Sequence, residues 1–154
     1  MVAPVQDGGE GVSVFNHVGQ CVADVARSRR FYEELFGFTF LREIHPPDDL
    51  SGQLLRLDPP LGMSAAYLQR DGLVLELLHF DRPGNPPYRE RPMNEPGLTH
   101  VSLSVDDIDA TLARVSGFGG EVLTDTNSGG GVFIRDPDGQ LVELLPMTYR
   151  DSLG

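Results

Sequence analysis

Two glutamates stand in nearly the same local sequence in the two halves of the chain. Residues 71–78 read DGLVLELL and residues 138–145 read DGQLVELL, so Glu76 and Glu143 each lie four residues after a glycine and inside an apolar run. An apolar run that follows an Asp-Gly turn is typical of a buried strand. Burying an ionised carboxylate is unfavourable unless it is paired or binds a metal. The repeated feature therefore predicts one shared purpose for the two acids.

Two histidines repeat in step with these acids. His17 and His100 each lie seven residues before an aspartate, Asp24 or Asp107, that is placed to cap a helix. The separation of histidine from glutamate is 59 residues in the first half and 43 in the second. The difference of 16 is close to the length of a proline-bracketed stretch at residues 45–62, which we interpret as an insertion. Two tandem copies of one βαβββ unit explain these spacings.

The chemistry that the four residues suggest is metal binding. A pseudo-twofold relation between the copies would bring His17, Glu76, His100 and Glu143 together in the groove between the halves. Mixed nitrogen and oxygen ligands suit divalent Zn, Ni, Co, Mn or Fe better than soft ions or calcium. Four protein ligands leave positions for water or substrate oxygens, as in a catalytic metal site.

The elements that must position these residues follow an α+β order. The prediction divides the chain into a flexible arm at 1–12, a first module at 13–80, a linker at 81–97, a second module at 98–147 and a tail at 148–154. Within each module, one strand is followed by a helix and then three strands. The predicted strands are Val14–Val22, Phe38–Ile44, Met63–Gln69, Leu73–Phe80, Leu98–Val105, Glu121–Thr124, Gly131–Arg135 and Gln140–Pro146. The predicted helices are Val25–Phe36, one that begins after Asp107, and at most a short one around Ser51–Leu57 in the insertion.

Composition excludes several classes of protein. The 40% hydrophobic and 23% charged content is that of an ordinary globular chain. The net charge of −11 opposes binding to nucleic acid and to anionic membranes. No apolar run approaches the ~20 residues that span a bilayer, and a single cysteine, Cys21, excludes an intrachain disulfide. We expect a cytoplasmic protein with a small-molecule substrate, and any anionic part of that substrate needs local positive charge.

Several short motifs together resemble one known group of proteins. They are Asn16-His17-Val18, Arg30-Phe31-Tyr32, Phe36-Gly37, Glu76, Leu98-Thr99-His100-Val101, Val105-Asp106-Asp107, Asp136-Pro137-Asp138-Gly139 and Glu143. Over residues 13–147 the chain resembles the vicinal oxygen chelate superfamily, which includes glyoxalases, bleomycin resistance proteins and extradiol dioxygenases. The resemblance implies a cupped, barrel-like mixed sheet around a metal, with His17, Glu76, His100 and Glu143 as ligands. It also implies a homodimer.

Within that superfamily the chain is most similar to glyoxalase I, whose ligand set is His, Glu, His, Glu. That similarity implies one divalent metal per site, which binds two vicinal oxygens of a thiol-ketoaldehyde adduct and stabilises its enediolate. It further implies that Glu143 or Glu76 is the base that moves a proton between adjacent carbons. One position departs from glutathione-using members, because Cys21 stands where they have an arginine, so the thiol carrier stays open.

Three alternatives remain open from the sequence. Methylmalonyl-CoA epimerase also stabilises an enolate on a metal, but it needs two opposed bases and the predicted third strand holds no acid. Extradiol dioxygenases of the same superfamily use two His and one Glu around iron, so a fourth ligand argues against them. Members that bind drugs without catalysis tend to lose the metal ligands.

Overall fold

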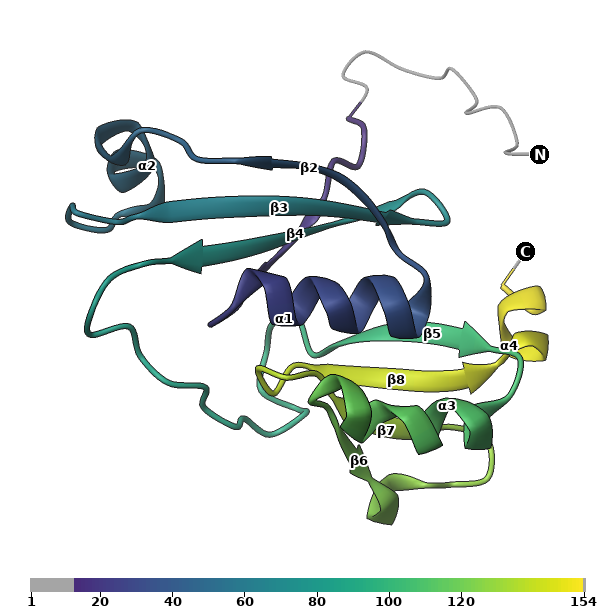
Figure 1. Cartoon of the computed structure of the whole chain (residues 1–154). Helices are drawn as coiled ribbons and strands as arrows, with labels where there is room; N and C mark the ends of the chain where they lie inside the picture. The colour runs from purple at the N-terminus through teal and green to yellow at the C-terminus, as the bar shows by residue number, and fades with distance from the viewer. Residues whose placement is uncertain (1–12, 154) are drawn as a thin grey trace.

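Residues 13–153 are described by a computed structural model and fold into two modules, each built on a four-stranded sheet (Figure 1). The predicted arm at 1–12 lies outside the described residues. The first module contains β1 Val18–Cys21, α1 Val25–Arg30 with a π-helical turn Phe31–Leu35, β2 Thr39–Ile44, α2 Asp48–Leu55, β3 Met63–Arg70 and β4 Leu73–Phe80. The second contains β5 His100–Val105, α3 Ile108–Val115, β6 Glu121–Leu123, β7 Val132–Arg135, β8 Leu141–Pro146 and α4 Met147–Asp151, with 3-10 turns at Ser116–Phe118 and Thr124–Thr126.

The two sheets have the same topology. The strand order is β1-β4-β3-β2 in the first and β5-β8-β7-β6 in the second. In each sheet the first strand runs parallel to the last, and the remaining pairs are antiparallel. A parallel pair needs a crossover, which α1 and α3 supply, and each helix begins at the predicted aspartate. Asp24 accepts from the backbone N–H of Arg27, and Asp107 from that of Ala110. The predicted α+β class and tandem βαβββ repeat are confirmed.

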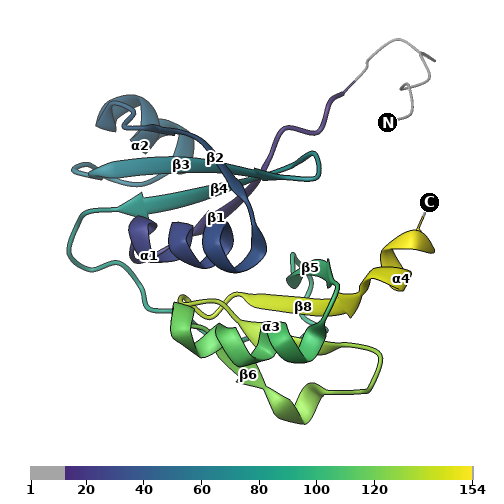
Figure 2. The same ribbon diagram turned by 45° about the vertical axis from the view of Figure 1, so that its right-hand side comes forward.

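One hydrophobic core joins the modules. It contains Phe31, Tyr32 and Leu77 of the first module together with Ile134 and Leu144 of the second. In both views α1 lies between the two sheets (Figures 1 and 2). The helix-bearing side of each sheet thus faces inward, and the opposite side of each sheet is left facing away from the shared core. The sheets stay separate, so the expected barrel-like closure does not form within the described chain.

A buried polar junction also joins the modules, and it is made by the turn before β8. Asp136 is almost fully buried and accepts hydrogen bonds from Gln20 and from the Tyr32 hydroxyl, the latter at 2.8 Å. Asp138 accepts from the backbone N–H of Ala23 and from the Ser28 hydroxyl. Burial raises the pKa of Asp136, and burial together with the neighbouring Asp136 charge raises the pKa of Tyr32. The turn that leads to Glu143 is therefore held against the first module.

Element boundaries differ from prediction mainly at the edges. β1 and β5 are shorter than predicted and begin after or at the key histidines, because the preceding residues have no paired strand. The insertion forms α2 three residues earlier than predicted, and the expected tail contains α4. Residues 81–99 hold no helix or strand and run from β4 down to β5 (Figure 1). Over residues 13–153, no helix is long and apolar enough to cross a membrane.

Candidate metal centre

The first half-site lies on the outward side of the first sheet. His17 Nε2 is 3.1 Å from Glu76 Oε2, and the Tyr67 hydroxyl donates to Glu76 Oε1 at 2.6 Å. Tyr67 is the cross-strand partner of Glu76, and its ring contacts His17 edge-on at 5.7 Å. Gly19 is the partner of Glu76 on the other side, where a Cβ atom would lie 3.2 Å from Oε2. The absence of a side chain at Gly19 leaves room for the carboxylate.

The second half-site repeats this arrangement on the second sheet. His100 Nε2 is 3.5 Å from Glu143 Oε2, and the Ser102 hydroxyl donates to the same oxygen at 2.8 Å. Phe133 is the cross-strand partner of Glu143, and its ring contacts His100 edge-on at 5.3 Å. Ser102 occupies the register position of Gly19, and Phe133 that of Tyr67.

The two half-sites differ in how their carboxylates are held. Tyr67 and His17 contact different oxygens of Glu76, so both oxygens are engaged. Ser102 and His100 contact the same oxygen of Glu143, and among residues 13–153 its Oε1 accepts no hydrogen bond. The Glu143 side chain is also the more exposed, at 26% against 11% for Glu76. Glu143 is therefore the less constrained of the two acids.

The phenol of Tyr67 has a perturbed acidity. Burial, the hydrogen bond to Glu76 and the charge of Glu76 together raise the pKa of Tyr67 to about 12. The hydroxyl therefore stays protonated at neutral pH and acts as a donor to the carboxylate.

Each histidine is oriented by the residue before it. His17 Nδ1 lies 2.5 Å from Asn16 Oδ1, and His100 Nδ1 lies 2.8 Å from Thr99 Oγ1. An Nδ1–H donated to these oxygens leaves Nε2 unprotonated and facing the glutamate, which is how metal-binding histidines are usually held.

The donor atoms fit a divalent metal. Nitrogen and oxygen ligands lie about 2.0–2.2 Å from zinc, so adjacent ligands of one ion are separated by roughly 3–3.5 Å. The Nε2 to Oε2 distances in the two half-sites, 3.1 and 3.5 Å, fall in that range. Each half-site alone supplies two ligands, fewer than the three or four of known catalytic sites.

The four predicted ligands do not meet within one chain. Among the residues that the structure describes, no three His, Cys, Asp or Glu side chains are close enough to share a metal. A cavity of about 590 Å³ does open between the halves, lined by residues of both modules, but it does not bring the two His and Glu pairs together. The reason is the shared core, because apolar residues of both modules pack together while each His and Glu pair lies within its own module.

Sequence reasoning missed the hydrogen bonds that Tyr67 and Ser102 donate to the two glutamates. It predicted Tyr67 as core or pocket wall and Ser102 as lining a cavity, and Ser102 does line the cavity between the modules. The signal for Tyr67 was available, because a two-residue turn at Asp71-Gly72 pairs residue 70 with 73 and hence Tyr67 with Glu76. His79 lies three residues past Glu76 on β4, a spacing that predicts a side chain facing away from the Glu76 site, and its Nδ1 lies 3.1 Å from the Val22 carbonyl oxygen.

Comparison with known proteins settles the family. The family model described as "Glyoxalase/Bleomycin resistance protein/Dioxygenase superfamily" matches residues 14–144. The chain belongs to this superfamily. The match spans both half-sites, from before His17 to beyond Glu143.

Individual relatives are distant. The chain is 29% identical over 140 residues to the uncharacterized protein YaeR of Escherichia coli, covering 87% of this chain and 96% of that one. It is 29% identical over 137 residues to the lactoylglutathione lyase GLX1 of Arabidopsis thaliana, covering 85% of this chain but only 43% of that longer protein. Among solved structures, it resembles the fosfomycin resistance protein FosX of Listeria monocytogenes complexed with Mn(II), with a TM-score of 0.62 and 16% identity. That likeness covers 94% of this chain and all of FosX, and at this identity it shows a shared fold.

Proposed function

We propose that the protein is a divalent-metal-dependent lyase or isomerase of the glyoxalase I type. Its substrate would be a thiol-ketoaldehyde adduct, in which a proton moves between adjacent carbons. The observation that carries the proposal is the matched pair of half-sites. In each, the histidine Nε2 lies about 3 Å from a glutamate oxygen, and the Nδ1 of the same ring contacts a side-chain oxygen of the preceding residue. The two glutamates repeat in residue type, in cross-strand register and in the aromatic ring that contacts their histidine, which two unrelated exposed acids would not do.

A second copy of the chain would complete the site. The outward faces carry large exposed apolar residues beside the ligands, with Phe15 at 67% and Leu98 at 79% exposure, each two residues before a histidine. In an isologous dimer, the first half-site of one chain would meet the second half-site of its partner. Two such sites per dimer give one metal per chain, with His17, Glu76, His100 and Glu143 as ligands.

The two glutamates have different roles in the proposed reaction. When bound, a divalent metal would supply Lewis-acid stabilisation of negative charge on the substrate's vicinal oxygens. Glu76, with both oxygens engaged, holds its position. Glu143 has one oxygen directed to His100 and Ser102 and the other available, so it takes the proton from one carbon and returns it to the next.

The epimerase alternative shares this geometry. In the completed dimer Glu76 and Glu143 would face one substrate, and two opposed bases are what an epimerase requires. The unequal support of the two carboxylates favours a single base, and β3 presents Tyr67 rather than a third acid toward Glu76.

Metal analysis coupled to turnover tests the proposal. Protein purified without chelator should contain about one divalent ion per chain, and His100→Ala should abolish it while His45→Ala, an exposed histidine of the insertion, should not. Turnover of methylglyoxal adducts with a panel of thiols should disappear on chelation and return with the metal. Undiminished ligand binding by metal-free protein, with no turnover of any adduct or acyl-CoA, would instead identify a binding protein.

A further inference from the structure

A cavity opens where the linker passes the beginning of β5 and β8. Its volume is about 110 Å³, well above the ~10–15 Å³ that one water molecule needs. Arg89 and Arg91 line it from the linker, and Leu98, Thr99 and Leu141 line it from the second module.

The cavity adjoins the second half-site directly. Thr99 lines the cavity and its hydroxyl contacts His100 Nδ1. Leu141 is the cross-strand partner of His100 and lies two residues before Glu143, on the same face of β8. Two residues of strand span about 7 Å, so a small substrate can reach from Glu143 into the cavity.

The cavity carries an excess of one positive charge. Arg89 Nη2 lies 3.3 Å and Arg91 Nε 3.8 Å from a single carboxylate oxygen of Glu95. Arg91 also donates to the Glu95 carbonyl at 2.9 Å. Each guanidinium has five N–H donors, so these contacts leave donors for a ligand. In a chain with a net charge of −11, a local excess of positive charge from two arginines and one glutamate is unusual.

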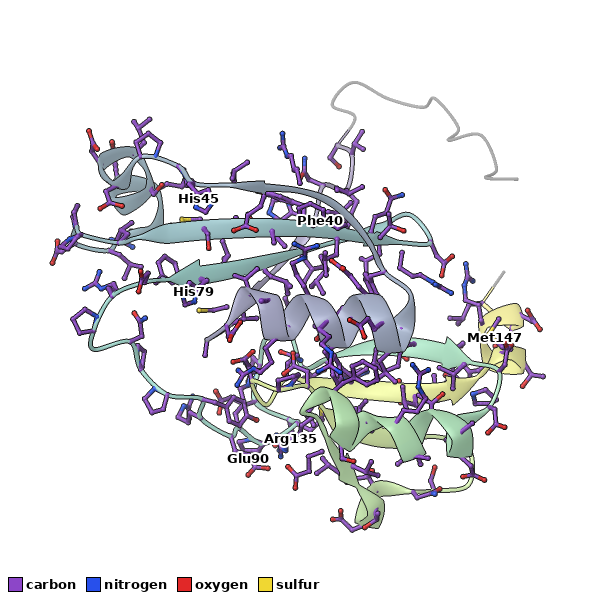
Figure 3. The ribbon with its side chains drawn as sticks, in the orientation of Figure 1. Phe40, His45, His79, Glu90, Arg135 and Met147 are labelled. Carbon is purple, nitrogen blue, oxygen red and sulfur yellow. The ribbon has the colours of Figure 1, made fainter. Side chains whose placement is uncertain are left out.

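The linker is fixed in place by a neighbouring arginine. Arg135 donates at 2.7 Å to the Tyr88 hydroxyl and at 2.7 Å to Glu90, which meet it where the linker reaches the second sheet (Figure 3). The Tyr88 ring packs over Gly139, where a Cβ atom would lie 2.9 Å from it. Glu90 is thus engaged away from Arg89 and Arg91 and does not neutralise them. Arg91 is the more firmly held of the two arginines, with a side chain 33% exposed against 75% for Arg89, and a cation already held in place binds an anion at a lower ordering cost.

We propose that Arg89 and Arg91 form a subsite for a carboxylate group of the substrate. The subsite binds carboxylates by itself; its role in holding the thiol carrier rests on the proposed function. A planar guanidinium fork matches a carboxylate in two parallel hydrogen bonds. One excess positive charge matches a carboxylate rather than a phosphate dianion.

The test uses a small fluorinated carboxylate, 4-fluorobenzoate, followed by ¹⁹F NMR with the full-length chain. Saturable binding is expected, with 4-fluorobenzamide, the neutral counterpart, binding at least about tenfold more weakly. Binding should be the same before and after chelation of metal. Equal binding of the two compounds, or loss of binding on chelation, would overturn the subsite. Inorganic phosphate should compete more weakly than benzoate, and stronger competition by phosphate would contradict the assignment to a carboxylate.

Amino-acid substitutions test whether 4-fluorobenzoate binds at Arg89 and Arg91. The double variant Arg89→Gln/Arg91→Gln should weaken 4-fluorobenzoate binding about tenfold or more, and the control Arg30→Gln/Arg56→Gln, which removes two exposed arginines elsewhere, should not. Glu95→Gln keeps both arginines and removes the competing charge, so it should tighten binding. Retained binding in the double variant, or weaker binding in Glu95→Gln, would refute the proposal. Metal content is measured on the same samples, so failure of the metal site and failure of the subsite are told apart.

Discussion

The hydrogen bond from Tyr67 to Glu76 gives the sharpest single test of how the first half-site works. The change is Tyr67→Phe, which removes one oxygen atom. The protein itself shows that a phenyl ring fits this place, because Phe133 contacts His100 at 5.3 Å and 86° as Tyr67 contacts His17 at 5.7 Å and 84°. The variant should therefore fold normally and lose only the 2.6 Å hydrogen bond.

The expected loss of metal affinity in Tyr67→Phe follows from the negative charge of Glu76, which accepts the hydrogen bond. A hydrogen bond to a charged group contributes about 1.5–3 kcal/mol, which corresponds to roughly 10–100-fold in affinity. Loss of a residue that orients a metal ligand has effects of the same order, about 10–100-fold. Ser102→Ala removes the 2.8 Å bond to Glu143, but this side chain is more exposed and water can replace the hydroxyl. The loss in Ser102→Ala should therefore be smaller.

The assay is competition for Zn²⁺ or Mn²⁺ against a chromophoric chelator at pH 7.5, with wild type, Tyr67→Phe and Ser102→Ala side by side. Thermal melts of the metal-free proteins check that the fold is intact. An affinity of Tyr67→Phe within twofold of wild type, with an unchanged melt, would show that Tyr67 does not position Glu76 for metal binding.

Three further predictions follow from the same geometry. Glu143→Gln should lower turnover by ~100-fold or more at near-normal metal content while Glu76→Gln costs less, and equal losses in a steady-state assay would indicate two interchangeable bases. Asp136→Ala should lower the free energy of unfolding by about 2–4 kcal/mol in a urea titration, because it removes the buried carboxylate that accepts from the Tyr32 hydroxyl, the Gln20 amide and two backbone N–H groups; a loss under 1 kcal/mol would contradict this. In metal-free protein, ultraviolet titration should find Tyr67 ionising near pH 12 and, in Glu76→Gln, closer to pH 10. Because the folded pKa of Tyr67 is the higher, its stabilising contribution is complete below about pH 10 and is lost as the pH rises toward 12; an unshifted titration in the Gln variant would exclude Glu76 as a cause.

The repeat was predictable from the sequence because it depends on local features. Asp24 and Asp107 cap their helices as expected, and each glutamate pairs with the histidine of its own half.

The relation between the halves was not predictable from the sequence. Which faces of two amphipathic sheets pack together depends on contacts between residues far apart in the chain, such as Tyr32 with Asp136 across 104 positions. We interpreted the Asp136-Pro137-Asp138-Gly139 turn as a device that fixes Glu143, and the structure shows that it also binds the first module. The same long-range packing keeps each His and Glu pair in its own module, and the joint ligand role of His17, Glu76, His100 and Glu143 stays a prediction.

In the proposed metal centre, half-sites of two chains combine to bind one metal, and subunit mixing tests whether the site is shared. His17→Ala and His100→Ala, each inactive in metal binding alone, are unfolded together at equal concentration, refolded and assayed for bound metal. In a shared site, half of the dimers are mixed and each mixed dimer regains one intact site, so the mixture should bind about a quarter of the wild-type metal. A mixture that binds no more metal than the separate variants would contradict the claim.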